Sequence, residues 1–416
     1  MRKLAVLLAL FLAILPLHAA VSSAYAPLYS RNIALGGTSV TSARYSEVFY
    51  SNPALVTGDN QFLSIPSASF TLYNINKLVQ PGGALDIFFT QNNSDEDMNR
   101  AFNQLINSIG AGNGDVVSFQ ASAGFISGIA GLSLDTGIDV HSMGEGGESS
   151  TLILEGNFAL SLAIALPWHI GEHHSLSFGL GAHLVFRGYT IDSLSGDIIP
   201  GGFTASSLID FYQSDDVLAS VLNQVPVAFG FAIPFDLGFT YSYSDIFKTG
   251  FVIKNLNGIY HMQTYSSANQ LYYMLTGGYL GDSVPEAPVQ GPSFRYATPV
   301  SFDIGFSLST PAGGIWDWID ITGSLDVTDV YSLFFTDGLS CENFLQRLHF
   351  GLELTLMRTF DFRFGINSGY MSFGFCFDFQ VFSLDFLYAA LEYGEHPGDK
   401  PLDFITLCIR IGFEED

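Results

Sequence analysis

Strict alternation between large apolar and small polar residues runs through most of this chain and limits what it can fold into. In VSFDIGFSLS, residues 300–309, every second position is apolar, and the positions between them are Ser, Asp or Gly. The same pattern recurs in residues 227–241 and 348–388. A period of two places successive side chains on opposite faces of a β-strand. Bulky apolar groups on one face and small polar groups on the other are typical of a transmembrane β-barrel, with the polar face inward.

The composition agrees with a membrane protein. Apolar residues make up 48% of the chain and charged residues only 13%, about half of the roughly 25% that soluble domains carry. After the N-terminal region, no apolar run approaches the roughly 18 residues that a spanning helix needs. A closed sheet satisfies its own backbone polar groups in lipid. We therefore predict an all-β fold, a transmembrane antiparallel β-barrel. The alternative is a soluble sandwich, whose exposed face rarely keeps Asp and Gly in place of Lys and Glu.

The alternation predicts fourteen strands. They are residues 62–73, 116–126, 131–141, 151–166, 175–187, 225–242, 247–256, 299–309, 319–330, 347–357, 360–367, 371–379, 381–391 and 403–413.

The lengths of the connections predict the orientation of the barrel. The longest connections are 74–115, 188–224 and 257–298, and all of them follow odd-numbered strands. Outer-membrane barrels have short periplasmic turns and long outer loops, so both termini are expected in the periplasm. Trp168, Trp316 and Trp318 fall in short turns and predict an aromatic belt on the periplasmic side.

The N-terminus predicts export. Arg2 and Lys3 precede an apolar stretch over residues 4–15, and small residues follow, as in a secretory signal. We divide the chain into a signal peptide (1–24), an N-terminal hatch that plugs the lumen (25–58) and a barrel with long extracellular loops (59–416). The expected location is the outer membrane of a diderm bacterium.

The segment before the first strand is rich in small residues and does not alternate for long. A barrel of fourteen strands encloses a lumen too wide for its own side chains to fill. Because the segment also carries apolar residues such as Leu35 and Phe49, we expect it to fold into the lumen. Gly36 and Gly37 allow a tight turn and close contact with the wall, and Asn52-Pro53 predicts a second turn.

Two short motifs in this segment resemble those of a known family. They are Leu35-Gly36-Gly37-Thr38 and Asn52-Pro53-Ala54-Leu55. They resemble the hatch of the FadL family, outer-membrane transporters of long-chain fatty acids and aromatic hydrocarbons. The resemblance implies a hatch-plugged barrel, uptake of hydrophobic small molecules and a lateral exit through the wall. Related barrels without a transport role, such as PorV-like secretion-system components, share this opening, so the motifs do not choose the substrate.

The predicted lumen is acidic, and basic residues face it at few positions. We expect the hatch residues Arg31 and Arg44 to dock onto this wall and to set how easily the plug moves. The residues expected to point inward are Asp135, Asp139, Glu155, Asp236, Asp303, Asp326, Glu353, Asp361, Asp378 and Asp385, with Arg187, Lys254, Arg363 and Arg410 opposing them.

Pro234 and the long loops carry the remaining candidate sites. Pro234 lies near the middle of the sixth predicted strand and cannot donate to the ladder, which predicts either a bulge or the lateral opening that the resemblance implies. The loops predict amphipathic helices over 94–110 and 206–222 and an aromatic-Met stretch after the seventh strand. The candidate ligand-binding residues are Met98, Phe102, Leu105, Ile106, Phe211, Tyr212, Tyr260, Met262, Tyr272, Tyr273 and Met274.

These features predict a monomeric channel for hydrophobic small molecules such as fatty acids, surrounded by outer-membrane lipid. A scaffold or secretion component and a general porin are the alternatives. The excess of 40 acidic over 15 basic residues argues against nucleic-acid binding. We expect no enzyme activity, cofactor or metal: the histidines of residues 169–174 are interpreted as a solvated turn, and Ser133, Asp139 and His141 as a chance set.

Overall fold

The computed structural model describes most of the chain. The signal peptide predicted for residues 1–24 lies outside the described residues. Those residues are 25–57, 61–90, 95–194, 200–207, 223, 225–244, 246–278, 290–311, 316, 318–335, 338, 340–379, 381–394 and 396–414.

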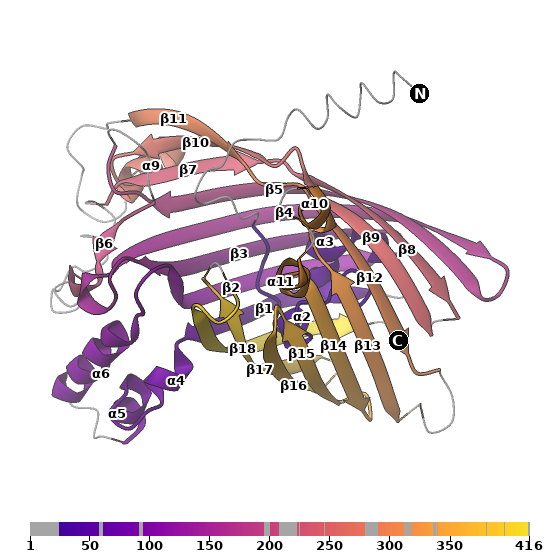
Figure 1. Cartoon of the computed structure of the whole chain (residues 1–416). Coiled ribbons are helices and arrows are strands. Elements are labelled where there is room, and N and C mark those ends of the chain that lie inside the picture. The colour runs from indigo at the N-terminus through magenta and orange to yellow at the C-terminus, as the bar shows by residue number, and fades with distance from the viewer. Residues whose placement is uncertain are drawn as a thin grey trace.

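One antiparallel sheet closes on itself to form a barrel (Figure 1). The first strand, β1 (Phe62–Tyr73), pairs with its neighbour β2 (Gly114–Ser127) and also with the last strand, β18 (Pro401–Glu414). We call each path of the chain across the barrel wall a strand line. The eighteen strands form fourteen strand lines, because three of these lines are each split into two strands and β6 (Phe203–Thr204) is a short addition beside β4. The predicted fourteen-stranded barrel is confirmed.

The other unbroken strand lines are β3 (Ala130–Met143), β4 (Thr151–Ile170), β5 (His174–Thr190), β13 (Ile319–Val327), β14 (Leu348–Leu356), β15 (Phe360–Asn367), β16 (Tyr370–Asp378) and β17 (Phe382–Glu392). The split lines are β7 (Val227–Ala232) with β8 (Phe235–Tyr243), β9 (Phe247–Leu256) with β10 (Ile259–Tyr265), and β11 (Gln290–Ala297) with β12 (Ser301–Ser309).

Two sequence predictions need correction. The predicted loop 257–298 contains β10 and β11, because the seventh line continues after a kink at Asn257 and Gly258, a pair that reads as the start of a loop in the sequence. Asn257 adopts a positive φ of 60°, and β10 then pairs with both β7 and β11. Trp168 lies on β4, paired with Leu176, and not in a turn, because β4 runs further than the alternation indicated.

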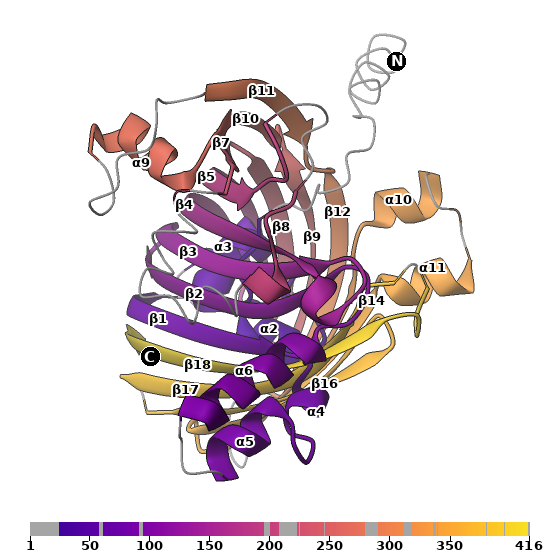
Figure 2. The same cartoon turned by 90° about the vertical axis from the view of Figure 1, so that its left-hand side faces the viewer.

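The two ends of the barrel differ. The helices that follow β1 and the helix α9 lie at the same end of the barrel, on different sides of it (Figures 1 and 2), and we call this end the loop end. The opposite end carries short connections such as 128–129 and 171–173, and we call it the turn end. The helices and 3-10 turns of the connections are α4 (Ile75–Leu78), α5 (Ala84–Thr90), α6 (Asp95–Ser108), η4 (Gly147–Ser149), α9 (Ala268–Thr276), α10 (Val330–Phe335) and α11 (Cys341–Gln346).

Among the described residues, no helix is long and apolar enough to cross a bilayer.

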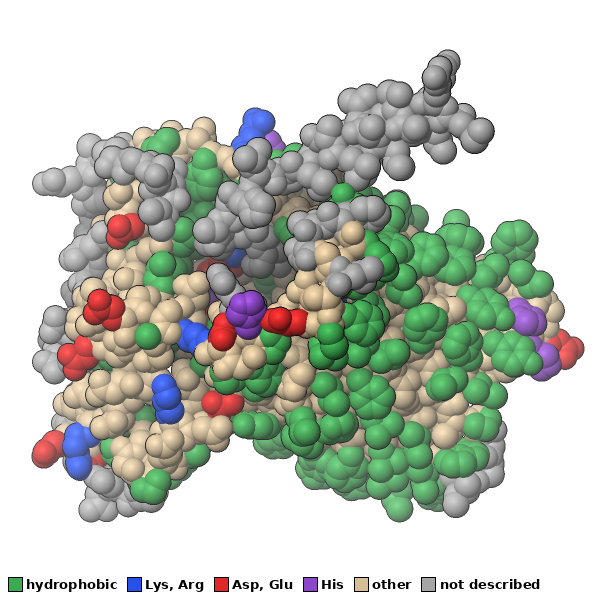
Figure 3. All heavy atoms as spheres, in the orientation of Figure 1, with side chains coloured by type: hydrophobic (Ala, Val, Ile, Leu, Met, Phe, Trp, Pro, Cys, Tyr) green, Lys and Arg blue, Asp and Glu red, His purple; other side chains and the backbone are tan. Residues whose placement is uncertain are grey.

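Apolar side chains cover the outside of the barrel. Along β4, the even-numbered residues Phe158, Leu162, Ile164 and Leu166 are each at least 40% exposed, whereas the odd-numbered residues from 155 to 165 are buried against the interior. Hydrophobic side chains crowd the right part of the face in Figure 3, while charged ones lie mostly at its left and centre. A belt of this kind faces the hydrocarbon layer in transmembrane barrels. We call these outward apolar residues the belt.

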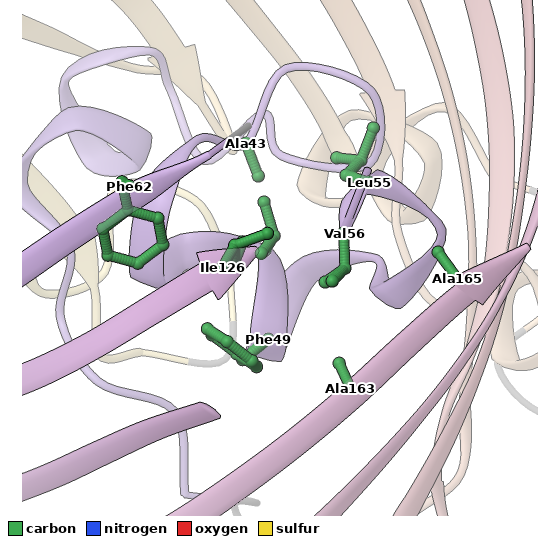
Figure 4. Packing of buried hydrophobic residues seen from close by; sticks show 9 residues of the cluster. Ala43, Phe49, Leu55, Val56, Phe62, Ile126, Ala163 and Ala165 are labelled. Atoms are coloured by element: carbon green, nitrogen blue, oxygen red, sulfur yellow. The ribbon is translucent and has the colours of Figure 1, made fainter. Parts of the chain in front are cut away.

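The N-terminal segment, residues 25–57, lies inside the barrel. It is built from α2 (Ser30–Ala34), η1 (Tyr45–Glu47), α3 (Val48–Ser51) and η2 (Pro53–Leu55). Its helix α2 contacts β15 to β17, and its turn η2 contacts β4, β5 and β8, so the segment reaches wall strands well separated around the sheet. An apolar cluster joins it to the wall (Figure 4). The cluster contains Ala43, Val48, Phe49, Leu55 and Val56 of the segment with Phe62, Ile126, Ala163 and Ala165 of the wall.

Candidate functional site in the barrel lumen

The turn at Gly36 and Gly37 presses directly against the wall. Both residues have positive φ angles, 68° and 86°, a conformation that glycine adopts without steric cost. A Cβ on Gly36 would lie 2.4 Å from the carbonyl oxygen of Phe350. On the wall side, a Cβ on Gly365 would lie 2.0 Å from the backbone nitrogen of Gly36. Glycine is therefore required on both partners of this contact.

The second motif docks in the same way. The side-chain oxygen of Asn52 accepts a hydrogen bond from the Ala54 N–H at 3.0 Å, which holds the turn around Pro53. The Asn52 amide nitrogen donates to the carbonyl of Val40 at 2.9 Å and to that of Phe239 in the wall at 3.3 Å. The motif thus closes its own turn and binds strand β8 with one side chain.

Wall glycines form the floor under this second turn. A Cβ on Gly179 would lie 2.1 Å from the Ala54 nitrogen, and one on Gly238 would lie 2.0 Å from the Asn52 side-chain oxygen. Our sequence reasoning missed these residues. The signal was present, because both are glycines at inward-facing positions of long strands.

Arg31 connects the N-terminal segment to the opposite wall. Its guanidinium donates two hydrogen bonds to Glu353 on β14, at 3.0 and 2.6 Å, and both side chains are almost fully buried. It also donates to the Ser42 carbonyl at 2.7 Å and pairs with Glu47 at 3.3 Å. Burial raises the pKa of Glu47 above its usual value, and the neighbouring Arg31 charge opposes that rise. Arg44 lies 3.7 Å from Glu353 and is partly exposed.

Backbone groups of the segment are also held by the wall. The N–H groups of Ser39 and Val40 both donate to one oxygen of Asp326, at 2.6 and 2.9 Å. A ring nitrogen of His349 lies 2.8 Å from the Gly36 carbonyl oxygen. Because several independent contacts must break together, this segment is attached more firmly than a tethered loop.

The basic residues predicted to face the lumen each pair with an acidic residue there. Arg187 binds Glu155 at 2.7 Å, and Lys254 binds Asp303 at 2.8 Å. Arg410 binds Asp378 at 2.9 Å. Arg363 binds Glu353, Asp361 and Asp385. The predicted facing of these strands is confirmed at these positions.

The sets weighed as catalytic or metal sites do not assemble. Ser133 donates to Asp135, His141 contacts Asp115, and Asp139 accepts from Ser118, so the three residues have separate partners. Within the described part of the chain, no group of three or more His, Cys, Asp or Glu residues is placed to hold a metal ion.

A hydrogen-bonded chain joins the N-terminal segment to the wall on the other side of the lumen. Ser161 donates to the Tyr50 hydroxyl at 2.8 Å and lies 2.9 Å from a ring nitrogen of His183. The other ring nitrogen of His183 lies 3.2 Å from Asp236. The ring of Tyr50 stacks on His183 with centroids 5.0 Å apart, and its hydroxyl donates to Asp135 at 3.2 Å.

The wall is interrupted next to this chain, at Pro234. The residue separates β7 from β8, although both strands keep one register with β5, and the His183 N–H donates to the Pro234 carbonyl at 3.0 Å. On the other side, the register shifts within the pairing of β8 with β9. Side chains replace ladder bonds there: the Asn257 amide donates to the Ile233 carbonyl at 3.1 Å, and Asp236 accepts from the Asn255 N–H at 2.8 Å.

A cavity of about 100 Å³ lies between the N-terminal segment and this interruption. It is bounded by Tyr25 and Tyr50 on the segment side and by Pro234, Lys254 and Tyr260 on the wall side. Tyr260 and Met262 are buried in β10, not in a loop as predicted. They belong to an apolar cluster that adjoins the cavity, with Ala159, Val185, Tyr189, Ile191, Ala228, Ala232 and Tyr296.

The remaining candidate ligand-binding residues lie on loops. The predicted helix over 94–110 exists as α6, and Ile106 is buried in a cluster that the half-buried Phe102 joins. Tyr272, Tyr273 and Met274 lie on α9, with Tyr272 37% and Met274 51% exposed. Leu105 and Met98 also lie on α6. Phe211 and Tyr212, and nearly all of the predicted helix 206–222, lie outside the described residues.

Several solved structures resemble this fold over most of its length. The P. putida toluene transporter TodX matches 93% of this chain and 99% of its own, with 11% identity and a TM-score of 0.44. A Pseudomonas aeruginosa FadL homologue matches 95% and 100%, with 11% identity and a TM-score of 0.45. The monoaromatic hydrocarbon channel CymD matches 93% and 97%, with 12% identity and a TM-score of 0.44.

Comparison at the level of sequence adds nothing to these likenesses. No protein-family model matches the chain, and no curated protein matches it. The solved structures include a protein of the family that the opening segment resembles.

Proposed function

We propose that this protein is an outer-membrane channel that takes up hydrophobic small molecules such as long-chain fatty acids. In this proposal it works as a monomer, with both termini in the periplasm and residues 25–58 acting as a hatch. One observation carries the proposal: an anchored N-terminal segment occupies the lumen directly beside the place where the wall loses its regular pairing. A plugged barrel with an interrupted wall suits an apolar cargo, which gains little from a water-filled pore.

The proposed route has three stages. Apolar residues of the loop end, with Tyr272 and Met274 exposed on α9, capture the molecule. The cluster around Tyr260 and Met262 then receives it above the hatch, where tyrosine and methionine offer an adaptable apolar surface. Pro234 marks the lateral opening through which it leaves toward the membrane.

The buried contacts of the N-terminal segment support this function over a general porin. A porin needs an open aqueous lumen, whereas here Arg31 and Asn52 bind walls on different sides of the barrel. A scaffold or secretion component of the same barrel class would share the plug. It would not need an apolar cluster inside the loop end.

Uptake by cells separates these functions. Cells that lack their own fatty-acid transporter, and express the full-length chain, should take up radiolabelled oleate faster than cells without it. Met262→Gln should reduce this uptake several-fold, because it places a polar group in the receiving cluster. Met357→Gln is the matched control, since Met357 lies in a turn and is 64% exposed.

Heat-modifiable migration on gels verifies that each variant barrel is folded. Uptake no faster than that of cells without the protein would contradict the channel function. Equal uptake by folded Met262→Gln and the wild type would contradict the proposed route.

A further inference from the structure

A second apolar hollow lies on the outside of the barrel, away from the lumen. It has a volume of about 380 Å³ and lies over strands β3, β4, β5 and β7, toward their loop-end portions. Volumes of about 300–1,000 Å³ are usual for ligand sites. We call it the outer groove.

Two neighbouring glycines form the floor of the outer groove. Gly156 on β4 is paired with Gly188 on β5, and both occupy outward-facing positions, most of which carry large apolar residues elsewhere on these two strands. A Cβ on Gly156 would meet no atom within 4 Å. No backbone approach requires a glycine there, in contrast to the glycines under the N-terminal segment. The absence of a side chain at Gly156 therefore leaves open space on the outer face of the barrel.

Large apolar side chains form the walls. Phe158 and Ile138 are 40% and 52% exposed, and Phe186 and Phe229 complete the sides on the next two strand lines. Phe186 and Phe229 stack with their centroids 6.1 Å apart. Leu271 also lines the groove. It belongs to α9, which lies at the loop end of the barrel (Figure 2).

Both threonine hydroxyls of the groove are engaged with the wall itself. The Thr136 hydroxyl donates to the Asn157 carbonyl at 3.1 Å, and the Thr190 hydroxyl accepts from the Leu154 N–H at 3.0 Å. The side chains of Glu155 and Asn157 point to the inner face of the wall and are buried there, and Glu155 pairs with Arg187 in the lumen. The surface of the groove therefore recognises hydrocarbon and no charged headgroup.

We propose that the outer groove binds an acyl chain of a lipid from the surrounding membrane. The groove continues the belt directly, since Phe158 is at once a groove wall and a belt residue. A chain lying there would gain van der Waals contacts with the aromatic surface of the groove. This site is independent of transport through the lumen.

Photo-crosslinking in proteoliposomes tests the proposal. The full-length chain is reconstituted with a phospholipid that carries a diazirine on one acyl chain, and labelled peptides are identified by mass spectrometry. We expect labelling of peptides that contain residues 154–158 and 186–190. Gly156→Phe should lower this labelling several-fold by filling the groove. Gly323→Phe is the matched control, because Gly323 also lies in an outward position and its Cβ would meet no atom.

Equal labelling of the wild type and Gly156→Phe would overturn the proposal. Labelling by a free diazirine fatty acid, without labelling by the phospholipid, would also overturn it, because the occupant would then be cargo. Heat-modifiable migration verifies folding. If Gly156→Phe does not fold, Leu271→Asp places a charge at the loop end of the groove without altering a strand, and it should lower labelling in the same way. Unchanged labelling in that variant counts against the proposal.

Discussion

Single side chains decide how firmly the lumen is filled. Arg31 and Glu353 form a buried, bidentate ion pair. Glu353 also pairs with Arg363. Removing one partner of a buried pair costs about 3–5 kcal/mol, because the other charge is left uncompensated. In this barrel that cost falls on the contact between the N-terminal segment and the wall.

Arg31→Met should therefore loosen the N-terminal segment while leaving the barrel closed. We expect a higher single-channel leak in planar bilayers and faster protease cleavage within residues 25–57. Arg100→Met is the control, since Arg100 pairs with Asp97 on α6 and is 53% exposed, and exposed pairs contribute about 0–1 kcal/mol. A leak in Arg31→Met no greater than in Arg100→Met would show that this ion pair does not hold the segment.

At the scale of elements, the barrel has one weak region where three adjacent strand lines are split. β7 ends before Pro234, β9 ends before Asn257, and β11 ends before Thr298. The pairing is bridged there by side chains such as Asn255 and Asn257. A strand line joined in this way opens at lower cost than a continuous ladder.

Restoring an N–H at position 234 should strengthen this region. In Pro234→Ala, the new N–H faces the His183 carbonyl, because β5 keeps its register with both β7 and β8. We expect the barrel to melt at a higher temperature, consistent with about 1 kcal/mol for one added hydrogen bond, and oleate uptake to fall. Pro167→Ala, at the turn end of β4, serves as the control. Unchanged uptake in a stabilised Pro234→Ala would remove Pro234 from the route.

The loop elements separate packing from capture. Phe102 packs against the cluster of Ile106, Ile109 and Leu152, so Phe102→Ser should destabilise the fold around α6 and increase its hydrogen exchange.

Tyr272 on α9 is partly exposed, so Tyr272→Ser should weaken binding of a fluorescent fatty acid and leave the melting temperature nearly unchanged. A loss of stability in Tyr272→Ser, with probe binding intact, would assign Tyr272 to loop packing.

For the whole molecule, the alternation of side chains was enough to predict the barrel and its strand number. The inward positions of charged residues such as Lys254 and Asp303 follow from the same parity, whereas their pairing is seen only in the structure. The extension of the seventh and eighth lines was not predictable, because Asn257 and Gly258 interrupt the alternation with turn residues while β10 and β11 continue the sheet through long-range pairing.

The partners of the N-terminal segment could be predicted only in part. Its turns at Gly36 and Asn52 follow from local residue chemistry. Its contacts with Gly179 and Gly365 join residues far apart in the chain, and no local pattern encodes them. The outer groove at Gly156 was missed because a glycine on the outer face interrupts the pattern by a single residue.

Conductance of a truncated barrel tests the central claim, that the N-terminal segment closes the lumen. Deleting residues 27–55 leaves every wall strand intact, and the truncated protein is reconstituted in planar bilayers beside the full-length chain. Because the lumen of a barrel this wide is not filled by its wall side chains, we predict a clear increase in single-channel conductance. A truncated, folded barrel that conducts no more than the full-length protein would contradict the account.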